Sequence, residues 1–167
     1  NELTSLQDRV PPFAFEKVQQ ILTTQLGNSY KKIISIDQIP IGSASLAQVH
    51  KAKLIDNKNI ILKVQRPDIE KFFRLDLDVM NQVANIIQRI KSISRGNDWI
   101  GIARESKRVL LRELDFRIEA QYAARFKQQF IEDSDILIPS VFWDLSTSKV
   151  LCLEYLPGIK INDIKSL

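Results

Sequence analysis

The sequence is poor in the residues that support most metal and covalent chemistry. Its 167 residues include one cysteine and one histidine. An internal disulfide is therefore excluded, and neither a zinc site nor a Ser-His-Asp site is supported. Cys152 lies in an apolar run, which predicts a buried, reduced thiol of a cytosolic protein. His50 alternates with Gln48 along a predicted strand, and we expect it at the surface.

Long hydrophobic runs are also missing. No stretch approaches the ~18 apolar residues that a membrane span needs, and no signal peptide is visible. The net charge is only +4, and the basic residues are scattered without interleaved aromatics, which disfavours nucleic-acid binding. We expect a single cytoplasmic domain, with contact to a membrane surface left open.

Glycine is scarce, and only one of the five glycines falls in the stretch that most resembles a phosphate-binding loop. Residues 40–65 are predicted to form a strand, a tight turn, a strand, a polar turn and a strand. Their spacing matches the kinase glycine-rich pattern G-x-G-x-x-G-x-V. The residues at its specified positions are Gly42, Ala44, Ala47 and Val49. Since alanine replaces two glycines, this loop should be stiffer than a glycine-rich one.

The side chains of this predicted loop are all small. Gly42, Ser43, Ala44 and Ser45 would let backbone N–H groups approach anionic phosphate oxygens. Lys63 lies on the last of these strands, in the place of the kinase V-A-I-K lysine. An ordinary β-hairpin turn built from small residues remains the alternative for this stretch.

Apolar spacing predicts three helices. The first covers residues 13–26 and ends at Gly27. The second begins after Asp68, a plausible N-cap, and continues to about Lys91, and the third covers roughly residues 98–130. Besides those within residues 40–65, strands are predicted at residues 33–39, 138–143 and 149–154.

The third helix carries a carboxylate on a mostly apolar face. Projected at about 100° per residue, Glu113 has mainly apolar or small neighbours, and Lys63 lies on an apolar strand. Because each charge needs a partner when it is partly desolvated, we expect Lys63 and Glu113 to form an ion pair. The alternative pairs Glu113 with Arg117 and leaves Lys63 in solvent. Asp115 lies about 200° round the helix from Glu113, which disfavours a carboxylate-pair hydrolase.

Four segments resemble the UbiB (aarF-domain) atypical kinases and occur in that family's order. They are LQDRVPPF (6–13), PIGSASLAQVHKA (40–52), ILKVQRPDI (61–69) and ELDFRIEAQYA (113–123). In that family an alanine-rich loop replaces the glycine-rich one. The family's E-x-D motif corresponds to Glu113-Leu114-Asp115, and its strand lysine corresponds to Lys63. The resemblance implies an α+β fold of the protein-kinase N-terminal-lobe type, with a five-stranded antiparallel sheet, an αC-type helix and a long inserted helix.

The resemblance also implies a domain layout. Residues 1–158 would form the lobe, and residues 159–167 would begin a truncated C-terminal lobe. The parts of the first lobe would be an N-terminal helical extension, three strands with the loop, the inserted helix, the αC-type helix, and two strands with the hinge (1–32, 33–65, 68–91, 98–130 and 138–155). The family's catalytic loop and Mg²⁺ ligands belong to the C-terminal lobe, so we expect this chain alone to be inactive.

For the full-length protein the resemblance implies an ATP-dependent kinase or ATPase that supports ubiquinone or other prenylquinone biosynthesis. Lys63 would contact the α- and β-phosphates of Mg-ATP, Glu113 would orient Lys63, and residues 42–45 would cover the phosphates. Asp115 would have a regulatory role, by contact with a K-x-G-Q segment that the family carries upstream.

The resemblance further implies where the adenine would bind. Its walls would be Val49 and Ile61, and the hinge would be Glu154, Tyr155 and Leu156. The alternative function is a non-catalytic, nucleotide-gated module that docks on membrane lipid or on quinone-biosynthesis enzymes.

Overall fold

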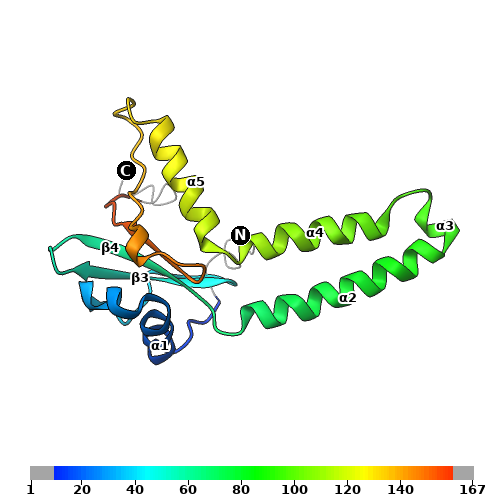
Figure 1. Ribbon diagram of the computed structural model, residues 1–167, viewed down its shortest axis with the longest axis horizontal. Coiled ribbons are helices and arrows are strands. Elements are labelled where there is room, and N and C mark those ends of the chain that lie inside the picture. Colours follow the sequence, from blue (N-terminus) through cyan, green and yellow to red (C-terminus); the bar gives the residue numbers. More distant parts are fainter. Residues whose placement is uncertain (1–9, 160–167) are drawn as a thin grey trace.

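The structure is a computed structural model that describes residues 10–159. A five-stranded antiparallel sheet carries helices on both faces, and a long helical hairpin projects from one end of it (Figure 1). This arrangement confirms the predicted α+β class and the five-stranded antiparallel sheet. The parts of the predicted extension at residues 1–9 and of the predicted second lobe at residues 160–167 lie outside the described residues.

The sheet has the strand order β1-β3-β4-β5, and the short β2 also pairs with β3. Neighbouring strands are antiparallel throughout. The strands are β1 (Ile33–Ile36), β2 (Gly42–Ser43), β3 (Ala47–Leu54), β4 (Asn59–Gln65) and β5 (Val150–Glu154). Since β1 and β2 pair with opposite ends of β3, they act together as one interrupted edge strand.

One predicted strand is absent from its expected place. Residues 138–143 form only an isolated bridge between Val141 and Leu153, and the fifth strand is β2 instead. Pro139 has no backbone N–H to donate to a ladder, and the chain soon enters the 3₁₀ helix η3 (Trp143–Leu145). The prediction of a strand at 138–143 was therefore wrong.

One face of the sheet packs against α1 (Phe15–Leu26), which ends at Gly27 as predicted. Gly27 has φ = +50°, a conformation that favours glycine, and the 3₁₀ helix η2 (Gly27–Lys32) follows. The buried aliphatic side chains of α1 and β4 are Val18, Leu22, Leu26, Ile60, Leu62 and Val64. Cys152 is buried in the same core as predicted, and burial raises the pKa of its thiol to about 12.

His50 lies on this face, where it is fully buried, so the prediction of a surface histidine was wrong. Residues 13–15 and α1 cover the side of β3 that the alternation pattern had assigned to solvent. His50 contacts the Asp37 carbonyl oxygen through Nδ1 at 2.8 Å and Gln48 Nε2 through Nε2 at 2.9 Å. The ring of Phe15 lies 5.7 Å from the imidazole, centroid to centroid.

The opposite face carries α5 (Phe116–Gln129) and a smaller core. Phe116 and Ala120 from α5 pack there against Ala47 and Leu151 from the sheet. Aliphatic packing covers less of this face, and its remaining surface is available to charged side chains.

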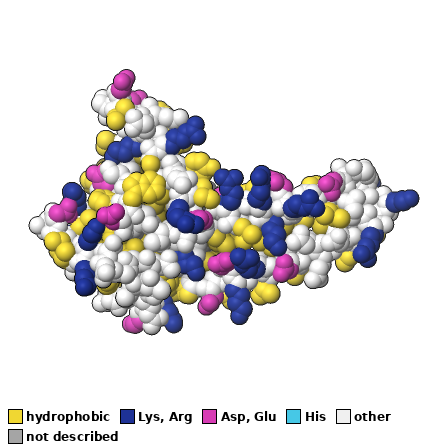
Figure 2. All heavy atoms as spheres, viewed as in Figure 1, with side chains coloured by type: hydrophobic (Ala, Val, Ile, Leu, Met, Phe, Trp, Pro, Cys, Tyr) yellow, Lys and Arg dark blue, Asp and Glu magenta, His cyan; other side chains and the backbone are white. Residues whose placement is uncertain are grey.

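The projecting hairpin consists of α2 (Ile69–Arg89), α3 (Lys91–Ser94) and α4 (Trp99–Glu113), with α2 packed along α4 (Figure 1). Figure 2 shows apolar side chains exposed along it between charged ones. Asp68 takes the predicted N-cap place of α2, although its side chain makes no capping hydrogen bond. Among residues 10–159, no helix is long and apolar enough to cross a membrane.

Candidate functional site

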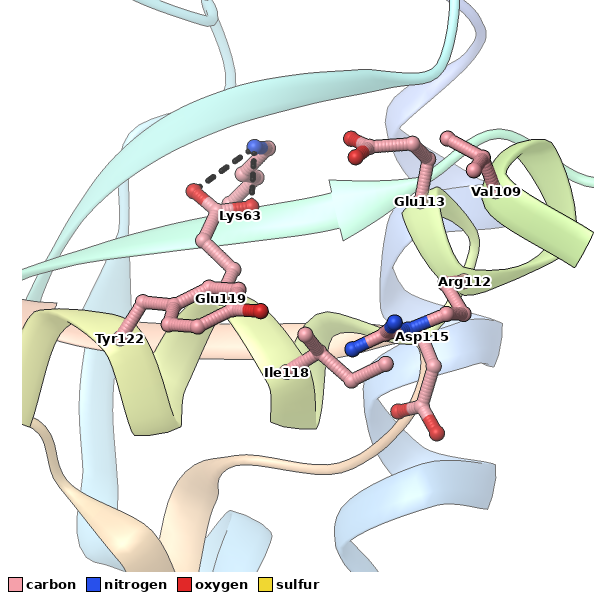
Figure 3. A pocket seen from close by; sticks show the side chains of 8 residues that line it. All are labelled: Lys63, Val109, Arg112, Glu113, Asp115, Ile118, Glu119 and Tyr122. Carbon is pink, nitrogen blue, oxygen red and sulfur yellow. Dashed lines mark hydrogen bonds and ion pairs between the residues drawn. The ribbon is translucent and has the colours of Figure 1, made fainter.

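The site is built around Lys63, in the middle of β4. Its ammonium group donates hydrogen bonds to both carboxylate oxygens of Glu119 on α5, at 2.9 and 2.7 Å (Figure 3). Lys63 Nζ also lies 4.9 Å from the centroid of the Phe116 ring. The Lys63 and Glu119 side chains are 30% and 46% exposed, so the pair stays partly hydrated. The ion pair therefore joins the sheet to α5 at a surface that a charged ligand can reach.

The expected pairing of Lys63 with Glu113 is corrected by this geometry. The long helix predicted over residues 98–130 is two helices, which meet at Leu114 and Asp115. Because the chain changes direction there, the helical projection used for Glu113 does not continue into α5. Glu113 ends α4, and Glu119 occupies the first turns of α5 opposite Lys63.

The break between α4 and α5 has identifiable causes. Asp115 has extended backbone geometry and caps α5 by accepting a hydrogen bond from the Arg117 N–H at 3.0 Å. Buried Gln65 donates through Nε2 to the Leu114 carbonyl at 2.7 Å, and the Phe116 N–H donates to the Ser148 carbonyl at 3.0 Å. These bonds satisfy backbone groups that an uninterrupted helix would have paired internally.

Asp115 is occupied by a local interaction. The Arg117 side chain donates to both of its carboxylate oxygens, at 2.6 to 3.1 Å. Hydrogen bonding from Arg117 holds the pKa of Asp115 below its usual range. The predicted alternative, a pair between Glu113 and Arg117, is also not formed, because Arg117 points to its own helix cap.

An open cavity of about 490 Å³ lies between Lys63 and the elbow of α4 and α5 (Figure 3). Both basic and acidic side chains reach it, and Glu113 faces it from the end of α4. The lining residues are Lys63, Val109, Arg112, Glu113, Asp115, Ile118, Glu119 and Tyr122. Lys63, Glu113 and Asp115 therefore line the same cavity. Lys63 pairs with Glu119, however, and not with Glu113 or Asp115.

The predicted loop forms the hairpin turn between β2 and β3. Gly42 pairs with Val49, and the Ala44 N–H donates to the Ala47 carbonyl at 2.8 Å to close the turn. Ala44 and Ser45 are exposed at its tip, and Ser43 is half-buried. The loop is therefore a hairpin turn of small residues, as the alternative predicted. Its exposed tip leaves backbone groups accessible to a ligand.

The predicted adenine walls lie on the same face of the sheet as Lys63. Val49 is the cross-strand partner of Lys63, and Ile61 lies two residues before it on β4. With Gly42 opposite Val49, a row runs across the sheet from the loop to Lys63. Val49 and Ile61 are half-buried, and neither lines the cavity at the elbow. Val49 and Ile61 therefore lie beside Lys63 in the sheet but outside the cavity at the elbow.

The predicted hinge residues Glu154, Tyr155 and Leu156 continue the end of β5. The Glu154 N–H donates to the Ser140 carbonyl at 2.9 Å, and the Tyr155 N–H donates to the Asn59 carbonyl at 3.1 Å. Hydrogen bonds from Ser140 lower the pKa of the Glu154 carboxyl. A base bound at this segment would therefore have to use the Leu156 N–H or backbone carbonyls.

Sequence reasoning missed Glu119 as the partner of Lys63. The signal that could have found it is Asp115, since aspartate is a preferred N-cap and predicts a new helix start at that point. A helix that starts after Asp115 places Glu119 one turn in, on the side of Phe116 and Ala120. Within residues 10–159, no cluster of three or more His, Cys, Asp or Glu side chains could hold a metal ion.

The chain is similar in sequence to proteins of one known family. A family model described as the ABC1 atypical kinase-like domain matches residues 5–167. The chain is 40% identical to the protein named ACTIVITY OF BC1 COMPLEX KINASE 7, chloroplastic, of Arabidopsis thaliana, covering all of this chain and 24% of that one. It is 32% identical to the probable protein kinase UbiB of Pseudomonas paraeruginosa, covering all of this chain and 32% of the relative.

A solved structure shares the fold. The structure described as the complex of Rv3197 with erythromycin from Mycobacterium tuberculosis aligns with a TM-score of 0.76 and 28% identity. The alignment covers 92% of this chain and 38% of that one. The chain thus spans about a quarter to a third of the length of the curated relatives it matches.

Proposed function

Because this chain belongs to the ABC1 atypical kinase-like family, we propose that it is the nucleotide-binding lobe of an ATP-dependent kinase or ATPase. The observation that carries the proposal is the ion pair between Lys63 and Glu119. In protein kinases a strand lysine, held by a glutamate of a neighbouring helix, positions the phosphates of ATP. The same two residue types occur here on a strand and on the helix that packs against it.

In this proposal Lys63 contacts the α- and β-phosphates, and Glu119 orients Lys63. Residues 42–45 cover the phosphates, with backbone N–H groups as donors. Phosphoryl transfer depends mostly on positioning and on neutralising charge, so a fixed ammonium group is the contribution expected of this lobe. Mg²⁺ would arrive with ATP, and its ligands would come from parts of the protein other than residues 10–159.

The adenine would lie against the apolar part of the same sheet face. Val49 and Ile61 would wall the base, and the segment Glu154 to Leu156 would offer backbone hydrogen bonds through the groups that remain free of internal pairing. For Glu113 and Asp115, their position at the elbow cavity supports a regulatory contact with another segment of the protein rather than a contact with Lys63.

The biological role proposed for the complete protein is support of ubiquinone or another prenylquinone pathway. The similarity to a protein named UbiB and the sequence motifs support this role. The phosphoryl acceptor is left open between water, a small molecule and a protein. Association with membrane lipid or with quinone-biosynthesis enzymes belongs to the same proposal.

The test is a titration of Mg-ATP against the complete gene product, followed by thermal shift. We expect concentration-dependent stabilisation of the wild type, and loss of most of that shift in Lys63→Ala, because stabilisation by a ligand rises with the logarithm of its concentration divided by its dissociation constant. Lys58→Ala is the matched control, since Lys58 is an exposed lysine of the turn between β3 and β4, where it pairs with Asp56. Equal shifts for Lys63→Ala and the wild type would discredit the role of Lys63.

A non-catalytic module is the second candidate, and one observation favours it. The hairpin exposes large apolar side chains, as an interaction surface would. They include Phe72, Leu75, Val79, Val83, Ile86, Ile102 and Val109. Release of phosphate from Mg-ATP by the complete protein supports the enzyme. Binding of Mg-ATP without turnover, together with nucleotide-dependent capture of vesicles or partners, supports the module.

A further inference from the structure

Arg66 follows β4 directly and reaches two segments far from it in sequence. Its Nε donates to the Ala44 carbonyl at 2.8 Å, and its Nη2 donates to Ser43 Oγ at 3.0 Å. Nη2 also donates to the Pro11 carbonyl at 2.9 Å, and the guanidinium carbon lies 5.6 Å from the centroid of the Phe13 ring. One guanidinium group therefore joins the loop to the segment that precedes α1.

That segment is itself fixed to the sheet. The Phe13 N–H donates to Gln48 Oε1 at 3.0 Å, and Gln48 Nε2 donates to the Phe13 carbonyl at 3.3 Å. Gln48 is fully buried on β3, so both backbone groups of Phe13 are held by one immobile side chain. Arg66 thus holds the loop against a fixed support.

Arg66 and Lys63 point to opposite faces of the sheet. Side chains alternate along a strand, and Lys63 and Gln65 both point toward the α4–α5 side, where they bond to Glu119 and to the break between the two helices. Val64 points to the core on α1, and Arg66 continues this second face. The contacts of Arg66 with residues before α1 agree with this side.

The bond from Arg66 to Ala44 sets the direction of a peptide group. In a trans peptide the carbonyl and the N–H of the following residue point in opposite directions. With the Ala44 carbonyl held toward Arg66, the Ser45 N–H is directed away from this guanidinium group, and Lys63 lies on the face of the sheet opposite to Arg66. Ser45 is exposed at the tip of the turn.

We infer that Arg66 is a positioning residue that presents the Ser45 N–H to the phosphates of a nucleoside triphosphate. The inference rests on the proposed function and adds to it a residue outside the loop that controls the loop's geometry. In a glycine-rich loop the peptide groups can rotate at little cost. Here the Arg66 guanidinium group donates to three acceptors and fixes the peptide group between Ala44 and Ser45. Alanine can therefore occupy a position where kinases use glycine.

The experiment compares Arg66→Met and Arg66→Lys with the wild type in the complete gene product. Arg74→Met is the control, since it removes an exposed arginine that pairs with Glu70 on α2. Dissociation constants are measured for Mg-ATP and for adenosine. We expect Arg66→Met to weaken Mg-ATP binding about tenfold or more, as for a lost hydrogen bond to a charged group, with adenosine affinity unchanged. Arg66→Lys should keep only part of the wild-type affinity for Mg-ATP, since an ammonium group lacks the planar fork of donors.

Amide hydrogen exchange of residues 42–46, measured without nucleotide, gives a second readout. We expect faster exchange in Arg66→Met than in Arg74→Met or the wild type. Wild-type affinity for Mg-ATP in Arg66→Met, or unchanged exchange of the loop, would overturn the inference and leave the proposed function standing. An equal loss of Mg-ATP and adenosine affinity would also overturn it, because that pattern indicates a general defect of the fold. If the wild type itself bound no Mg-ATP, both proposals would fail.

Discussion

The two faces of the sheet differ in what fills them. The α1 face is packed with buried aliphatic side chains from β3, β4, β5 and α1. The α5 face has a small core, a partly hydrated ion pair and an open cavity. One sheet therefore separates the two tasks of this domain, since the packed face supplies stability and the open face supplies the groups that can meet a charged ligand.

Adjacent residues of β4 illustrate the contrast. Leu62 is fully buried on the α1 face, whereas Ile61 and Lys63 on either side of it are only half-buried on the other. Because strand side chains alternate, three consecutive residues sample both environments on the same backbone. Substitutions along β4 can therefore test the comparison with little change in local geometry.

The largest effect is expected from Leu62→Ala. Removing a fully buried leucine side chain typically costs about 2–5 kcal/mol, through lost transfer free energy and the cavity left behind. Ile61→Ala is the matched change on the open face and should cost clearly less, because its side chain is only half-buried. Urea denaturation of both variants measures the difference. Equal losses of unfolding free energy would break the comparison between the two faces.

The buried histidine makes the packed face sensitive to pH. Burial lowers the pKa of His50 from its ordinary value of 6.5, so the unfolded chain binds a proton before the folded one does. The stability contributed by neutral His50 is present above pH 6.5 and is lost as the pH falls from there through the folded pKa. The slope is at most about 1.4 kcal/mol per pH unit.

His50→Gln should weaken the dependence of the unfolding free energy on pH. Because His50 is the one histidine of the chain, no other imidazole contributes to this dependence. Unfolding free energies of the wild type and the variant at pH 7 and pH 5 give the measurement. The wild type should lose more stability between these two pH values than the variant does. A parallel decline of the two proteins would show that His50 does not titrate differently on folding.

A smaller effect is expected at the elbow on the open face. Asp115→Ala removes the N-cap of α5 and should cost about 1 kcal/mol at neutral pH. Since hydrogen bonding from Arg117 lowers the pKa of Asp115, its contribution is present above the ordinary value of 3.8 and is lost as the pH falls through the folded pKa. The difference in stability between the wild type and the variant should therefore shrink as the pH falls below 3.8.

Asp135→Ala is the control for this change, because Asp135 lies in an exposed loop after α5. It should leave the unfolding free energy at neutral pH nearly unchanged. If Asp115→Ala were as harmless as Asp135→Ala, the cap would not explain the break between α4 and α5.

The packed region could largely be predicted from the sequence. Alternation and turn residues located β3 and β4, and apolar spacing located α1 with its end at Gly27. These elements are specified by local patterns that the fold does not override. His50 is the exception, because the alternation of β3 does not reveal that residues 13–15 cover its face.

The open region was harder to predict, because its geometry depends on contacts between distant segments. The break before α5 is fixed by Gln65 and Ser148, which lie far from Leu114 and Phe116 in sequence. A helical projection across that break assigned the wrong carboxylate to Lys63. The charged residue types of the site were visible in the sequence, while the identity of the pair required the turn of the chain at Asp115.

The most direct test of the account is a double-mutant cycle on Mg-ATP affinity, with Lys63→Met and Glu119→Gln in the complete gene product. Because Lys63 and Glu119 form an ion pair, the proposed function predicts that each single variant loses most of the affinity and that the double variant loses little more. Glu113→Gln, combined with Lys63→Met, is the control and should give additive losses. Strict additivity for Lys63 with Glu119, and coupling of Lys63 with Glu113 instead, would contradict the account.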